Sequence, residues 1–177
     1  MWHPLIRHPD SPCDAVAAIE VQAERPAPAL LVLRYRLVGV TDALVVPPAS
    51  VGRADELWRH TCLEAFVRPV PGDAYTELNL SPGGQWAAYH FDDYRHDMTK
   101  AEVHPPDAQL DGSEVAFGAV WDLDHLRPLA PWRIGVSAVI EERGGRTSYW
   151  ALAHPPGRPD FHNADCFVLE LPAPELS

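Results

Sequence analysis

Glu64, Glu77 and Asn79 place two carboxylates and an amide on neighbouring predicted strands of the segment 57–95. Successive side chains of a strand point to opposite faces, so Glu77 and Asn79 share one face and the leucines beside them share the other. One register sets Glu64 directly opposite Glu77, whereas a slip of one residue separates them. Facing like charges destabilise a sheet unless a ligand, a cation, a proton or Arg95 offsets the repulsion. We interpret this face as a binding site, with a surface carboxylate pair, or a carboxylate satisfied by arginine, as the alternative.

Paired carboxylates also serve glycoside hydrolases, where one acts as the acid and the other as nucleophile or base. The spacing of Glu64 and Glu77 in the sequence does not set the distance between their carboxyl groups. A glycoside-active enzyme therefore stays open as an alternative, and we assign no catalytic residue.

The histidines are scattered, without the HxH or HExxH spacing of zinc sites, so we assign no metal site. A haem of the cytochrome type would need a methionine and a histidine as axial ligands. Met98 is the internal methionine, and His90, His154 or His162 could be its partner. A methionine in a loop more often packs against its neighbours. We expect no cofactor and keep haem or metal binding as an alternative.

Five of the six tryptophans divide into packing and contact candidates. Trp121 and Trp132 fall in the inward phase of strongly alternating segments, which indicates the core. Trp86 and Trp150 could contact a ligand or pack in the core, and we favour packing because most large aromatic side chains serve packing. Trp58 precedes its strand beside Arg59, so its ring is a candidate for stacking on a ligand.

Alternating hydrophobicity and Pro- or Gly-rich turns predict an all-β fold, an antiparallel β-sandwich of roughly ten strands. The nineteen prolines oppose long helices. We expect one domain over residues 1–177, with irregular ends at 1–12 and 172–177. A helical turn is expected over 55–57. The predicted strands are 15–23, 30–38, 43–46, 60–68, 75–80, 86–94, 101–104, 114–123, 132–142, 147–154 and 165–171.

The formal net charge of −11 disfavours nucleic acid and anionic membrane surfaces as partners. A neutral ligand such as a sugar, or a cation, is electrostatically easier to bind. Cys13, Cys62 and Cys166 lie far apart without a CxxC motif, which is typical of reduced thiols. The first residues contain no apolar signal segment, and no apolar run is long enough for a membrane span. We therefore expect a cytoplasmic protein.

Three stretches together resemble the DOMON-like proteins of bacteria, which are related to the family 9 carbohydrate-binding modules. They are LWRHTCLEAFV, YTELNLSPGGQWAAYHFDDYR and SYWALAHPPGRPDFHNADCFVLEL. The likeness runs from about Leu57 to Leu171 and lies in the order of these strands. The resemblance implies a sandwich of jelly-roll or immunoglobulin-like type with a ligand face that binds haem or sugars.

In the sugar-binding relatives, two aromatic rings hold a sugar between them while carboxylate, amide and arginine groups bind its hydroxyls. Trp58 resembles one ring, with Glu64 six positions later; Phe161 or His162 stands where the relatives have the second ring, and a tryptophan is absent there. We therefore predict a non-catalytic domain that binds a carbohydrate or a sugar-containing metabolite. The predicted ligand-binding residues are Trp58, His60, Glu64, Glu77, Asn79, Arg95, His154, His162 and Asn163.

Overall fold

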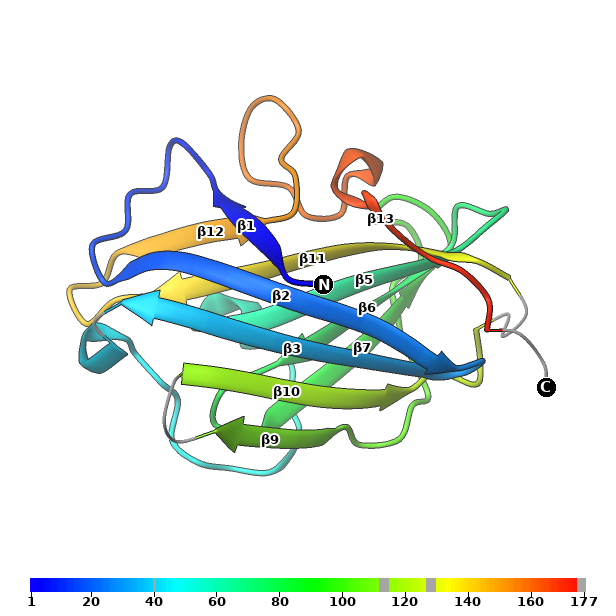
Figure 1. Ribbon diagram of the computed structural model, residues 1–177, viewed down its shortest axis with the longest axis horizontal. Coiled ribbons are helices and arrows are strands. Elements are labelled where there is room, and N and C mark those ends of the chain that lie inside the picture. The colour runs from blue at the N-terminus through cyan, green and yellow to red at the C-terminus, as the bar shows by residue number, and fades with distance from the viewer. Residues whose placement is uncertain (40, 112–114, 127–129, 175–177) are drawn as a thin grey trace.

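The strands of the computed structural model, which describes residues 1–39, 41–111, 115–126 and 130–174, form one strongly curled mixed sheet. Eleven strands follow one another in the order β4-β7-β6-β5-β11-β12-β1-β2-β3-β10-β9, while β13 and β8 attach to β11 and β7. Figure 1 shows β2, β3, β10 and β9 crossing in front of β11, β5, β6 and β7. The predicted all-β class is confirmed.

The element bounds are as follows. The first strands are β1 His3–Arg7, β2 Val16–Ala27, β3 Leu30–Gly39, β4 Gly52–Arg53, β5 Cys62–Pro69, β6 Tyr75–Leu80 and β7 Gln85–Phe91. The later strands are β8 Thr99–Lys100, β9 Asp107–Asp111, β10 Val115–Asp122, β11 Trp132–Glu141, β12 Thr147–Ala151 and β13 Leu169–Leu171. Three single-turn 3-10 helices are η1 Thr41–Ala43, η2 Leu57–Arg59 and η3 Ala164–Cys166.

The main core fills the space inside the curl. Leu31, Leu33, Tyr35 and Leu37 of β3 all point into it, as their alternation predicts. The opposite wall carries the apolar side chains of β5, β6, β7 and β11, and the hydroxyl of Tyr35 donates to the backbone oxygen of Glu64 across the core at 2.9 Å. Trp86, Trp121, Trp132 and Trp150 are all buried, so their interpretation as packing residues is confirmed.

The sheet is a half-barrel, and the predicted sandwich of two separate sheets is not what the structure shows. The short strand β1 joins the two halves, because His3–Leu5 pair with β2 while Ile6 and Arg7 pair with β12. This strand lies in a segment, 1–12, for which the sequence predicts irregular structure. The expectation of antiparallel pairing alone is also corrected, because β4 and β7 pair in parallel through Gly52↔Gln85 and Arg53↔Trp86.

Most predicted strands are present, although their ends are shifted. Two predicted strands are absent from the structure. The segment 43–46 makes a 3-10 turn and a single bridge, Leu44↔Glu142, and the segment 101–104 contains no strand. Short strands β4, β8 and β9 lie where none is predicted. Residue 114, the predicted start of β10, and the last three residues of the predicted irregular end lie outside the described residues. No described helix is long and apolar enough to cross a membrane.

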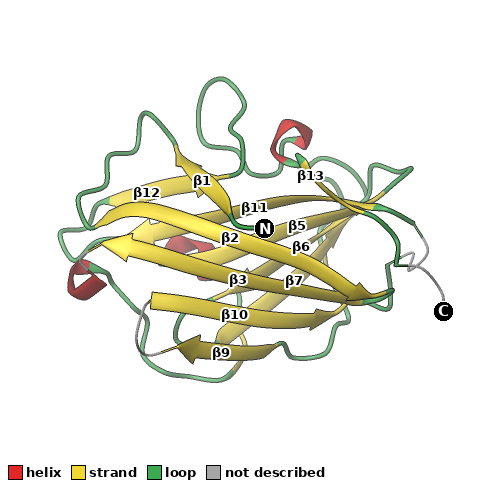
Figure 2. Cartoon of the chain, viewed as in Figure 1, coloured by secondary structure: helices red, strands yellow, loops and turns green. Residues whose placement is uncertain are grey.

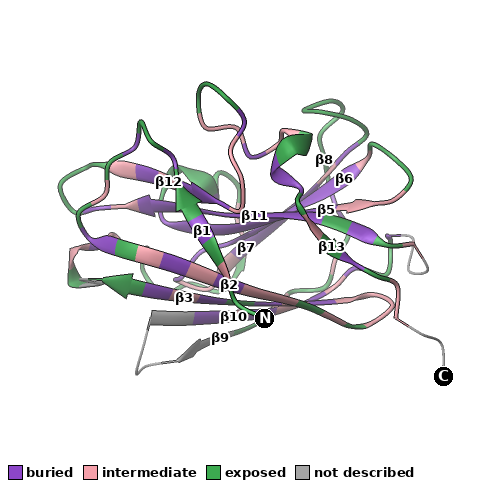
Figure 3. Cartoon of the chain, turned by 45° about the horizontal axis from the view of Figure 1, so that its top comes forward, coloured by how far each residue is buried: buried purple, intermediate pink, exposed green. Residues whose placement is uncertain are grey.

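Strands β5 and β6 are buried on both faces, which sets them apart from ordinary outer strands (Figure 3). One face meets the main core, and the other meets a second apolar cluster. Phe161, Cys166 and Phe167 contribute to this cluster from the connection between β12 and β13. That connection is loop apart from η3 (Figure 2). The polar face predicted for β5 and β6 therefore lies under a cover rather than in open solvent.

Candidate functional site

Glu64 and Glu77 lie on the covered face of the sheet, on adjacent strands and offset along them. The register pairs Glu64 with Asn79 and Phe66 with Glu77, so the two carboxylates are diagonal neighbours rather than directly opposite. The observed register is shifted by two residues from the one that would set Glu64 opposite Glu77. Because side chains alternate with a period of two, this shift leaves every side chain on its predicted face. Ser137 of β11 flanks Glu64 on the other side, and Tyr89 of β7 flanks Glu77.

An open cavity of about 1460 Å³ lies over this face. Glu64, Phe66 and Glu77 form its floor, with Tyr89 and Phe91 of β7 beside them. Its remaining walls come from η2, β8, β11, β12 and the β12–β13 connection. The other lining residues are Asp55, Glu56, Trp58, Arg59, Arg95, Met98, Thr99, Lys100, Val139, Thr147, Tyr149, Arg158, Pro159, Phe161 and His162.

Glu64 is a nearly dehydrated carboxyl group. Only 3% of its surface is exposed, Oε2 accepts a 3.3 Å hydrogen bond from the Ser137 hydroxyl, and Oε1 has no partner. Burial, together with the like charge of Glu77, raises the pKa of Glu64 to about 8. The hydrogen bond from Ser137 and the charge of Arg95 lower this pKa, but by less. Glu64 therefore holds a proton at neutral pH and can donate a hydrogen bond.

Glu77 is supported from its own strand. Its Oε1 accepts a 2.7 Å hydrogen bond from the amide nitrogen of Asn79, whose own oxygen has no partner. Burial raises the pKa of Glu77 as well, while Asn79 and the charge of Arg95 act in the opposite direction. Asn79 is fully buried and stands behind the carboxylate. It therefore positions Glu77 instead of lining the cavity.

His162 connects Glu77 to Tyr75 through its two ring nitrogens. The backbone N–H of Arg95 donates to the Tyr75 oxygen at 3.2 Å, so the hydroxyl proton of Tyr75 is free to point at His162 Nδ1, 2.7 Å away. Nδ1 then accepts, and the ring hydrogen sits on Nε2, 3.7 Å from Glu77 Oε2. Burial, and then the charge of Arg95, lower the pKa of His162 to about 4. The ring is therefore neutral at neutral pH, and its approach to Glu77 is a polar contact rather than an ion pair.

Asp160 ties the β7–β8 turn to the β12–β13 connection. Its carboxylate accepts from the Arg95 guanidinium at 2.8 Å and from the Tyr94 hydroxyl at 2.7 Å. Burial acts to raise the pKa of Asp160, but these hydrogen bonds outweigh it and the pKa is lowered. Arg95 makes this contact from a left-handed backbone with φ 52°. Such a conformation costs on the order of 1–3 kcal/mol in a residue other than glycine, and it occurs often at functional sites.

The far rim is built around Asp55. Its carboxylate accepts from the Tyr89 hydroxyl and from Lys100 Nζ, both at 2.8 Å. The hydrogen bond from Lys100, then that from Tyr89, lower the pKa of Asp55. Tyr89 reaches this rim from the floor strand β7, so one ring spans the depth of the cavity.

Trp58 lies at the mouth of the cavity, in η2. Its side chain is among the exposed large apolar groups, at 48%, and the Arg59 guanidinium lies 5.3 Å from its ring centre. Most other tryptophans of the chain are buried. An exposed ring beside a cavity is available for stacking on a ligand.

Comparisons with known proteins show a fold and no family. No family model and no curated protein matches the chain. A solved structure from Bacteroides uniformis does match, described as that of a "putative carbohydrate-binding protein". Its TM-score is 0.65 at 16% sequence identity, and the match covers 97% of this chain and 85% of that one. At this identity, the likeness demonstrates a shared fold alone.

The structure brings five of the nine predicted ligand-binding residues together in the cavity lining: Trp58, Glu64, Glu77, Arg95 and His162. Asn79 stands behind Glu77. The other three make contacts elsewhere: His60 pairs with Glu141 at 2.7 Å, His154 bonds to the Ile6 oxygen at 2.8 Å, and Asn163 caps η3 by accepting from the Asp165 N–H at 3.0 Å.

Several residues in or beside the cavity lining were not predicted from the sequence. Tyr89 of β7 lies directly opposite Glu77 of β6, so both side chains are on the same face. The alternation within the predicted strand 86–94 could have indicated this position. Asp55, Lys100 and Tyr149 reach the cavity only because distant segments fold together. Asp160 is adjacent in sequence to Phe161 and His162, and its role becomes visible only once Arg95 is placed beside it.

The contacts of the candidate axial ligands do not favour the haem alternative. Met98 lines the cavity with 61% of its side chain exposed. His90 faces Asp92 at 3.3 Å, His154 is bound to a backbone oxygen, and His162 accepts from Tyr75. Each histidine is thus held in another contact.

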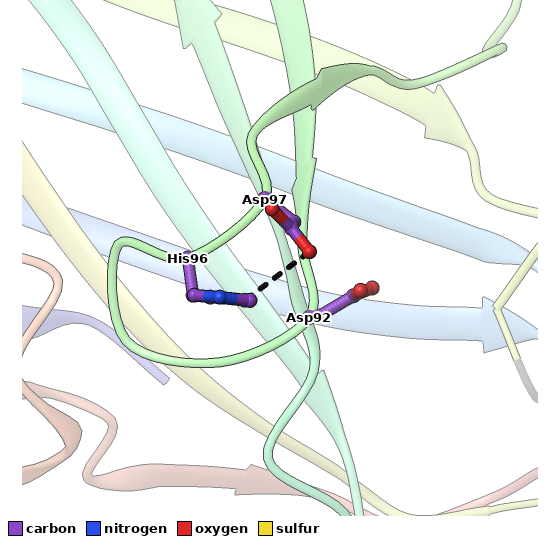
Figure 4. Close-up of side chains that lie close together, drawn as sticks. All are labelled: Asp92, His96 and Asp97. Atoms are coloured by element: carbon purple, nitrogen blue, oxygen red, sulfur yellow. Dashed lines mark ion pairs between the residues drawn. The ribbon is translucent and has the colours of Figure 1, made fainter.

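Among the described residues, one group could offer three metal ligands close together: Asp92, His96 and Asp97 in the β7–β8 turn (Figure 4). All three are exposed, and His96 lies 3.4 Å from Asp97. Exposed acidic groups gather in this way without an ion, so the prediction that the chain has no metal site is left unchanged.

Proposed function

We propose that this chain is a non-catalytic binding domain whose cavity takes a carbohydrate or a sugar-containing metabolite. The observation that carries the proposal is the floor of the cavity, where two buried carboxyl groups lie among aromatic rings and one carboxyl oxygen has no partner. A buried polar atom without a partner is costly, and ligand hydroxyls would satisfy it.

The position of each residue in the cavity indicates which part of the sugar it would contact. Trp58 and Arg95 contact the sugar at the mouth, Trp58 by stacking on an apolar sugar face, while Glu64, Glu77 and His162 bond to hydroxyl groups deeper in the cavity. The volume exceeds the roughly 300–1,000 Å³ of common small-ligand sites, which leaves room for more than one sugar ring. The description of the structural neighbour from Bacteroides uniformis supports the same ligand class, as does the resemblance to DOMON-like proteins.

Glycoside hydrolysis is the weaker candidate. A hydrolase of this kind needs one protonated carboxyl group and one ionised carboxylate, and environments that push their pKa values apart. Glu64 fits the first role, but burial raises the pKa of Glu77 in the same direction. Burial thus acts on both groups in the same direction, although Asn79 and Arg95 oppose it at Glu77, and no finding marks Glu77 as a nucleophile or base.

Thermal shift and calorimetric titration with a panel of mono- and oligosaccharides test the proposal. We expect at least one saccharide to stabilise the wild-type chain at millimolar concentration, and the Trp58→Ala variant to lose about tenfold in affinity, the loss of a ring contact of on the order of 1 kcal/mol or more. Because Trp58 is half exposed, the unliganded variant should melt close to the wild type.

The matched control is Trp2→Ala, which removes another partly exposed tryptophan that is not part of the cavity lining. It should bind the same saccharides as the wild type. If no saccharide stabilises the wild type, or if Trp58→Ala binds unchanged, the proposal fails.

A further inference from the structure

Three of the four lysine and arginine side chains that line the cavity are already paired with acids of the rim, and the fourth, Arg158, is exposed to solvent. Arg95 pairs with Asp160, Lys100 with Asp55, and Arg59 with Glu56, each at 2.8 Å. Within the described residues, neither Glu64 nor Glu77 forms an ion pair with lysine or arginine. The floor therefore holds two carboxyl groups without a direct ion pair to lysine or arginine, although the charge of Arg95 acts on both of them.

Two buried acceptor atoms without partners belong to residues that lie side by side on β5 and β6. Glu64 Oε1 and Asn79 Oδ1 are both buried without a hydrogen bond, and their residues are direct partners across β5 and β6. When no ligand is bound, burial together with the Glu77 charge favours a proton on Glu64 by raising its pKa to about 8. A ligand that brings its own positive donor would replace that proton.

The walls above the floor suit a positive group as well. Tyr89 and Phe91 lie beside Phe66 of the floor, and Tyr149 and Phe161 line the same space. The faces of aromatic rings attract ammonium groups, and the attraction strengthens where water is excluded. The carboxyl groups of the floor and the aromatic rings of the walls together suit an organic ammonium ion.

We propose that the ligand of this cavity carries a protonated amino group, as an amino sugar does, and that this group seats on Glu64 and Glu77 between the aromatic walls. The inference rests on the proposed function and narrows it from carbohydrates in general to amine-bearing ones. Binding leaves all covalent bonds intact. The ammonium group keeps its protons, and the proton of Glu64 passes to solvent as its carboxylate forms the new ion pair.

The test is calorimetric titration of the full chain at neutral pH with D-glucosamine, D-glucose and N-acetyl-D-glucosamine. We expect D-glucosamine to bind about tenfold more tightly than the other two, as one added charge-assisted hydrogen bond would give. Titration in phosphate and in Tris, which differ in heat of ionisation, should show net proton release with D-glucosamine and none with D-glucose.

A Glu64→Gln variant keeps the shape of the side chain and removes its titration. It should lose both the preference for D-glucosamine and the proton release. Glu170→Gln, an exposed change in β13 outside the cavity lining, should keep both. The buffer comparison on the wild-type chain stands even if Glu64→Gln does not fold.

The outcomes separate this inference from the proposed function. Equal affinity for all three sugars without proton release overturns the amine site and leaves carbohydrate binding intact. Binding of ethanolamine or choline with no response to any sugar supports the amine site and overturns the carbohydrate. No response to any of these probes overturns both.

Discussion

The buried carboxyl group of Glu64 makes the stability of the protein depend on pH. This group sits almost fully buried between Ser137 and Asn79, and burial favours the protonated form. In the unfolded chain the same group titrates near its usual pKa of about 4.3. Between these two values the folded protein binds the proton more tightly than the unfolded chain. Stability must therefore depend on pH through this residue.

The sign of this dependence follows from the raised pKa. The stabilising contribution of Glu64 is fully present below about pH 4.3 and is lost progressively as the pH rises to about 8. We expect the free energy of unfolding of the wild type to fall relative to that of Glu64→Gln by on the order of 3–5 kcal/mol across this window. Urea denaturation of both proteins at several pH values measures it.

Glu170→Gln again serves as the control and should follow the wild type. The pKa of Glu77 is also raised. The free energy of unfolding of Glu64→Gln should therefore still decline somewhat as the pH rises. A wild type and a Glu64→Gln variant whose stabilities run parallel over the whole range would mean that Glu64 is ionised in the folded protein.

At this scale, alternation alone predicts much of the site. It places Glu77 and Asn79 on one face of β6, and it places Trp121 and Trp132 in the core. The register could not be predicted, because pairings that differ by two residues bury the same side chains. The partners of His162 and Arg95 could not be predicted either, since Tyr75 and Asp160 come from distant segments.

At the scale of elements, the site depends on how closely the covering connection packs on the sheet. Gly135 of β11 is the point of closest approach, because a Cβ added there would lie 2.8 Å from the Phe167 ring and 3.1 Å from the Cys166 oxygen. Phe167 in turn stacks on Phe66 of the cavity floor, with ring centres 5.9 Å apart. A glycine in the middle of a strand here serves close packing.

We therefore expect Gly135→Ala to destabilise the fold by about 1–3 kcal/mol, the usual cost of overpacking, and to weaken ligand binding by displacing η3 and Phe167. Gly118→Ala in β10 is the matched control, because its added Cβ would approach only the Leu33 oxygen, at 3.8 Å. It should be neutral or slightly stabilising. Thermal melts compare the two, and a Gly135→Ala variant as stable as the control would contradict the packing described here.

The long strands could be predicted from hydrophobic alternation, whereas the short ones could not. β6 is recovered with its observed bounds, and β3 and β11 differ only at their ends. β1, β4 and β9 carry too few residues for a periodic signal, and β1 also changes partner part-way along. Burial of β5 and β6 on both faces depends on Phe161 and Phe167, which strand periodicity cannot relate to them.

At the scale of the whole molecule, the curled sheet separates two apolar regions with different roles. The main core inside the curl carries stability, while the smaller cluster on the covered face borders the cavity. The net charge of −11 fits a ligand that is neutral or positive. The all-β class could be predicted from prolines and alternation, but closure into one continuous sheet depends on the non-local pairing of β1 with β12.

The central claim is that a ligand binds over Glu64 and Glu77, and mapping the binding site by nuclear magnetic resonance tests it most directly. The isotopically labelled chain is titrated with the saccharide that gives the largest thermal shift. We predict saturating changes at the amides of β5, β6, β7 and η2 and in the segment 158–162. Changes confined to the outer face of β2 and β3, or none at any saccharide concentration, would contradict the account.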